Sequence, residues 1–107
     1  MHADCHDDRA RADGAVRGGI TLAPTRVPCG TVTFVITDTG PLSDSLSIFS
    51  EAPPVFEATP ELAPGQTTSL TPRFAAKGAV YLQSNTFQPE GNEGNGGVAE
   101  FAWLTLV

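Results

Sequence analysis

Short segments in which apolar and polar residues alternate are the feature that most constrains this chain. The clearest covers residues 31–37, where Val32, Phe34 and Ile36 share one side and threonines take most of the other. A period of two places successive side chains on opposite faces of a β-strand. Further strands are predicted at residues 15–22, 45–49, 67–74, 79–84 and 98–107.

Turn-forming residues separate these segments at regular intervals. Asp38-Thr39-Gly40-Pro41 follows the clearest strand, and residues 51–64 contain Pro53, Pro54, Pro60 and Pro64. Because proline cannot donate to a sheet ladder, we expect residues 51–64 to cross between sheets or to run along an edge. About seven short strands without a helical period predict an all-β fold, a Greek-key β-sandwich.

The chain of 107 residues has the size of one domain. Residues 1–14 have alanine as their recurring apolar residue, mixed with aspartate and arginine. This composition predicts a flexible N-terminal arm over residues 1–14, followed by the sandwich domain over residues 15–107.

Charge narrows the classes of partner. Twelve acidic residues against six basic ones give a net charge of -6, which disfavours binding to nucleic acid or to anionic lipid. No apolar run reaches the roughly 18 residues of a membrane-spanning helix, so no membrane insertion is predicted.

The two cysteines, Cys5 and Cys29, allow one internal pairing. A disulfide between them would pin the arm to the start of a strand and stabilise the fold by about 3 kcal/mol; two free thiols are the alternative. Small acidic β-domains with paired cysteines are commoner outside the cytoplasm. We therefore expect an extracytoplasmic protein, secreted or periplasmic, whose signal peptide has been removed before Met1; a cytoplasmic protein with a native Met1 is the alternative.

Three segments, at residues 22–40, 62–70 and 74–81, resemble the cupredoxin family, especially its plastocyanin-like and sulfocyanin-like members. They carry a Val-Pro-x-Gly-Thr-Val-Thr-Phe-like strand start (Val27 to Phe34), an Asp-x-Gly turn and a Leu-Ala-Pro-Gly-Gln turn (Leu62 to Gln66). The resemblance extends over roughly Ile20 to Val107. It implies a cupredoxin-like sandwich with a copper site at one end.

That family holds copper with two histidines, a cysteine and a methionine, because thiolate and imidazole make the copper site and the thioether tunes its potential. In this chain the resemblance places the first histidine at or beside Asp44 and the cysteine at Ser84. The second histidine falls near Pro89 and the methionine near Gly94. None of the four matches, so we predict vacant copper-site positions and no cofactor.

His2, Cys5 and His6 form the cluster that best suits a metal ion, since imidazole and thiolate bind zinc or copper. An arm that merely lies in solvent is the simpler interpretation. A metal-handling protein that uses this arm is nevertheless one alternative function, and a cupredoxin-type electron carrier is another.

No catalytic residues are predicted, because both histidines lie in the first six residues and no nucleophile elbow exists. We expect a non-enzymatic module with a binding or structural role, which contacts a protein partner or its own copies. The expected contact loop contains Leu42, Phe87, Glu90 and Asn92.

The sequence also suggests an apolar surface at one end of the sandwich, made by Phe87 together with Phe49, Val55 and Phe56. Trp103, on the closing strand, is expected in the core.

Overall fold

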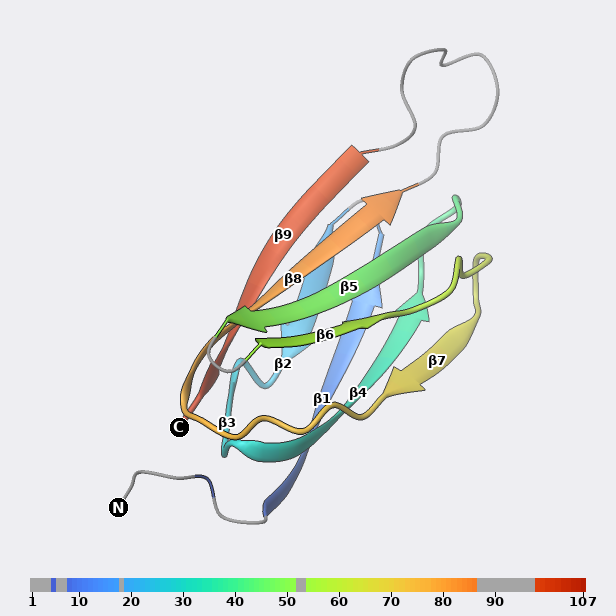
Figure 1. Cartoon of the computed structure of the whole chain (residues 1–107). Helices are drawn as coiled ribbons and strands as arrows, with labels where there is room; N and C mark the ends of the chain where they lie inside the picture. Colours follow the sequence, from blue (N-terminus) through green and yellow to red (C-terminus); the bar gives the residue numbers. More distant parts are fainter. Residues whose placement is uncertain (1–4, 6–7, 18, 52–53, 87–97) are drawn as a thin grey trace.

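The protein is a sandwich of two β-sheets in the computed structural model, which describes residues 5, 8–17, 19–51, 54–86 and 98–107. The four-stranded sheet has the order β2-β1-β4-β7 and the five-stranded sheet the order β3-β9-β8-β5-β6. Figure 1 shows the five-stranded sheet in front of the other. The strands are β1 (Asp8–Val16), β2 (Ile20–Ala23), β3 (Arg26–Val27), β4 (Gly30–Asp38), β5 (Asp44–Glu51), β6 (Pro54–Ala58), β7 (Thr67–Leu70), β8 (Gly78–Thr86) and β9 (Val98–Leu106).

Alternation along the strands builds the core between the sheets. Val32, Phe34 and Ile36 of β4 are fully buried, while the residues between them are half-buried. Phe34 meets Phe74 edge to face, with ring centroids 6.5 Å apart. Leucine, isoleucine and valine from the facing sheet complete this core: Leu46, Ile48, Val80, Leu82, Leu104 and Leu106. The predicted all-β sandwich is therefore confirmed.

The number of strands differs from the prediction of about seven, because the described residues form nine. The segment over residues 15–22 is the end of β1, a turn and β2, which pairs back antiparallel on β1. The proline-rich segment supplies β6, which lies at the edge of the five-stranded sheet beside β5. An edge is where a strand that contains proline is tolerated.

The expected arm over residues 1–14 is wrong for its second half. Residues 8–14 belong to β1, which lies inside the four-stranded sheet and pairs parallel with β4 over nine residues. Its inward positions include Ala12 and Gly14, and the space at Gly14 is taken by a side chain of the neighbouring strand β4. A Cβ added at Gly14 would come within 2.8 Å of the Ile36 side chain. The segment alternates small and charged residues, so it lacked the large apolar side chains that reveal a strand.

No helix among the described residues is long and apolar enough to cross a membrane.

Candidate functional site

Two places in the structure gather unusual side chains, and the first is a buried polar cluster at one end of the sandwich. Asp44 begins β5, while Ser84 and Thr86 lie at the end of β8. The register pairs Asp44 with Thr86 and Leu46 with Ser84. Since β5 and β8 both alternate, all three polar side chains face inward, and each is buried. This polar cluster (Asp44, Ser84 and Thr86) includes both described positions at which the resemblance placed a vacant copper-ligand position.

Hydrogen bonds fix Asp44 in this cluster. The Thr86 hydroxyl donates to one carboxylate oxygen at 2.9 Å, and the Ser45 amide donates to the other at 3.0 Å. The backbone of Asp44 also exchanges two hydrogen bonds with Leu62, at 2.7 and 3.0 Å. Sequence reasoning missed Thr86, although its place two residues beyond Ser84 on one strand puts both on the same face.

Ser84 has a different environment from Thr86. Its hydroxyl oxygen is fully buried and finds no hydrogen-bond partner among the described residues. A buried polar atom without a partner destabilises a fold by about 1–3 kcal/mol, because it has lost its hydration.

Two matched substitutions test this difference. We expect Ser84→Ala to raise the free energy of unfolding by about 1 kcal/mol, since it removes the unpaired hydroxyl. Thr86→Val keeps the size of the side chain but removes the hydroxyl that donates to the Asp44 carboxylate. It should lower the free energy of unfolding by about 1–3 kcal/mol. Urea unfolding of both variants measures the two changes. Changes of the same sign would contradict the difference between an unpaired Ser84 hydroxyl and a hydrogen-bonded Thr86 hydroxyl.

A hollow of about 280 Å³ adjoins the polar cluster and is lined by Arg17, Gly40, Pro41, Leu42, Asp44 and Thr86. Leu42, from the expected contact loop, is thus beside the cluster and only partly exposed. The other expected contact residues, Phe87, Glu90 and Asn92, lie outside the described residues, as do Pro89 and Gly94.

The second unusual place is the outer side of the five-stranded sheet. Phe56, Phe49, Tyr81 and Trp103 lie directly opposite one another across β6, β5, β8 and β9. Phe101 lies on the same side, two residues before Trp103. We call these five residues the aromatic face.

Three rings of the aromatic face contact one another, and four of its five residues are open to solvent. The rings of Phe49 and Tyr81 stack at 6.1 Å, and Tyr81 meets Trp103 edge to face at 4.3 Å. Phe49, Phe56, Trp103 and Phe101 are 40, 65, 59 and 66% exposed. A groove of about 440 Å³ runs among these side chains and is also lined by Ser47, Glu51 and Gln83.

The prediction that Trp103 lies in the core is wrong. Inward positions on β9 belong to Leu104 and Leu106, so Trp103 points outward. The expectation of an apolar surface is right in that Phe49 and Phe56 are exposed, but they lie on the face of the sheet. Val55, which was expected beside them, is half-buried against the core.

Comparison with solved structures identifies the fold to which this arrangement of strands belongs. Reduced auracyanin from the photosynthetic bacterium Roseiflexus castenholzii superposes with a TM-score of 0.53 at 15% sequence identity, covering 92% of this chain and 96% of that chain. The chain has the cupredoxin fold.

The copper-containing nitrite reductase of Thermus scotoductus is also similar to this cupredoxin-like domain, with a TM-score of 0.43 and 17% identity. That match covers 92% of the domain but only 27% of the reductase. No protein-family model matches the chain, and no match was found among curated protein sequences.

The donor atoms of this cupredoxin-like domain do not fit the copper centre that its fold family implies. The polar cluster offers a carboxylate and two hydroxyls, which are hard oxygen donors, whereas that centre needs thiolate and imidazole. Among the described residues, no three of histidine, cysteine, aspartate and glutamate gather as metal ligands.

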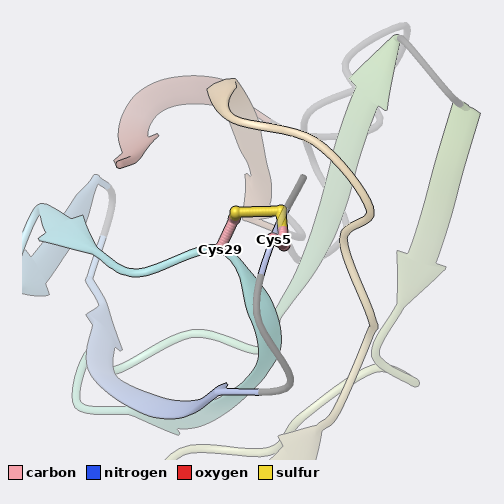
Figure 2. The surroundings of a disulfide bond; sticks show 2 residues. All are labelled: Cys5 and Cys29. Carbon is pink, nitrogen blue, oxygen red and sulfur yellow. A yellow bond between two sulfur atoms is a disulfide. The ribbon is translucent and has the colours of Figure 1, made fainter. Parts of the chain in front are cut away.

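Both cysteines are joined in the predicted disulfide, which is confirmed, with Cα atoms 5.2 Å apart (Figure 2). Because neither cysteine is free, no thiolate is available to the polar cluster. Cys29 also lies far from that cluster along β4, since it directly precedes the strand and the cluster lies near the strand's other end. The same bond removes Cys5 from the expected metal set with His2 and His6, which themselves lie outside the described residues.

Proposed function

We propose that this cupredoxin-like domain is a copper-free, non-enzymatic binding module that works outside the cytoplasm and contacts a protein partner through its aromatic face. The observation that carries the proposal is the row of four aromatic residues in register across four strands. The proposed contact surface is therefore the face of the sheet, and not the loop end that the sequence favoured.

The size of the aromatic face supports a binding role. An aromatic side chain buries roughly 150–250 Å² in a folded protein. The four most exposed residues of the aromatic face therefore present on the order of 450 Å² of aromatic surface to solvent. A continuous apolar patch of a few hundred square ångströms on a soluble protein is often functional. Exposed tryptophan, tyrosine and phenylalanine are also the residues that interface centres favour.

Net charge and the disulfide support two other parts of the proposal, namely a partner that is a different protein and a location outside the cytoplasm. A net charge of -6 opposes the approach of a second copy, which favours a different protein as the partner. The Cys5–Cys29 disulfide is typical of proteins in oxidising compartments outside the cytoplasm.

Recovery of the partner from the native source, followed by reconstitution with purified components, tests the proposal. We expect Phe56→Ser/Trp103→Ser to weaken the purified complex at least about 30-fold, as truncation of a central aromatic residue does in other interfaces. Ser69→Ala, at an exposed position of the other sheet, is the matched control and should leave affinity unchanged.

Two results would overturn the proposal. One is a complex whose affinity is the same with and without the two aromatic side chains. The other is the failure of chemical cross-linking in the native source to trap any partner on the wild-type domain.

A further inference from the structure

The groove in the aromatic face has a definite electrostatic character. Among the described residues, its lining combines five aromatic rings with the polar Ser47 and Gln83, and Glu51 is its one charged residue. No lysine or arginine of the described part of the chain lines it. Aromatic rings carry negative potential on their faces, so the rings and the carboxylate all favour a positive charge.

The position of Glu51 suits a ligand that lies on the rings. Glu51 is two residues from Phe49 on β5, so both side chains project from the outer side of the sheet, roughly 7 Å apart along the strand. Phe49 lies opposite Tyr81, whose ring it stacks against at 6.1 Å. A planar cation that packs on the solvent side of the aromatic face beside Phe49 is therefore within reach of the carboxylate.

Arginine matches this arrangement better than other side chains do. Its guanidinium is planar, stacks on aromatic faces and presents a fork of donors to a carboxylate. Lysine offers a compact and strongly hydrated charge that stacks less well. The acidic net charge of the whole chain would also speed the approach of a basic partner.

We propose that the aromatic face binds an arginine-bearing segment of the partner protein, with the guanidinium packed against the rings that line the groove beside Phe49 and paired with Glu51. This inference rests on the proposed function and specifies the chemistry of the partner.

A nearby cation supplies an internal control. Lys77 lines a smaller adjoining hollow that shares Glu51 and Tyr81 with the groove. Because both side chains line this hollow, we expect the Lys77 ammonium group to compete with the ligand for the Glu51 carboxylate. Removal of the Lys77 charge should therefore strengthen binding of a cation, whereas removal of the Glu51 charge should weaken it.

The test is a titration of the whole chain with synthetic peptides of alternating arginine and glycine. Trp103 is the only tryptophan and is 59% exposed on the aromatic face, so its fluorescence reports occupancy. The comparison peptide carries citrulline, which has the shape of arginine without its charge. We expect saturable binding of the arginine peptide and at least about fivefold weaker binding of the citrulline peptide.

Three variants sharpen the result. Glu51→Gln should weaken binding of the arginine peptide about two- to fivefold, as loss of an exposed ion pair does. Lys77→Gln should raise that affinity. Tyr81→Leu keeps an apolar side chain but removes the ring, and it should weaken the arginine peptide more than Tyr81→Phe does.

The outcomes separate this inference from the proposed function. Equal binding of the arginine and citrulline peptides, no saturable response to arginine, or a response to a neutral oligosaccharide such as maltohexaose alone would each overturn the assignment of an arginine partner. The role of the aromatic face in protein binding would stand or fall separately, on the purified complex with Phe56→Ser/Trp103→Ser.

Discussion

Replacement of Phe34 by alanine is expected to lower the free energy of unfolding by about 3–5 kcal/mol. Phe34 is fully buried at the middle of β4, where its ring meets that of Phe74 edge to face. Alanine there would lose the apolar transfer energy of the ring and leave a cavity that the two sheets cannot close. Urea unfolding monitored by circular dichroism at 25 °C measures the difference.

Phe56 provides the matched control, because it is the same residue type at 65% exposure. Phe56→Ala should change the free energy of unfolding by less than about 1 kcal/mol, as surface substitutions usually do. Similar losses for the two variants would show that the aromatic face contributes to the stability of the isolated chain, and that it is not a surface reserved for binding.

Removal of the Cys5–Cys29 disulfide is the second large effect. The bond joins residues 24 positions apart. Closing a loop of that length lowers the conformational entropy of the unfolded chain and so stabilises the fold by about 3.5 kcal/mol. We expect the Cys5→Ala/Cys29→Ala variant to lose about that amount. Its unfolding by urea, compared with that of the oxidised wild type, gives the number.

Chemical reduction of the wild type separates the bond from the packing of Cys29, which is only 2% exposed. Reduced wild type keeps both sulfur atoms and should still lose most of the stabilisation. A loss below about 1 kcal/mol in the reduced protein would mean that the oxidised bond constrains little of the unfolded chain.

The fold was predictable from the sequence where large side chains alternate. Residues 31–37 place Val32, Phe34 and Ile36 on one face, and the structure buries all three. β1 was not predictable in this way, because its inward positions hold alanine, glycine and valine. The need for a small residue at Gly14 arises from the close approach of Ile36, which is a property of the packed sheet and not of the segment itself.

The candidate sites show the same limit. The resemblance pointed to Asp44 and Ser84, and the structure brings both to adjacent strands at one end, but the hydrogen bond from Thr86 depends on the register of β5 and β8. Trp103 was assigned to the wrong side because β9 has apolar residues on both faces. A period of two divides such a strand into two sides without saying which one is covered.

The place of β1 inside the four-stranded sheet bears on how the chain tolerates proteolytic processing. Loss of residues 8–16 would remove an interior strand, leave β2 without its partner and expose an edge of β4. A single cut within β1 would not have this effect by itself, because the Cys5–Cys29 bond keeps the N-terminal piece attached to the domain. Open edges recruit strands from other molecules. A chain truncated beyond Val16 is therefore expected to aggregate more readily than the whole chain.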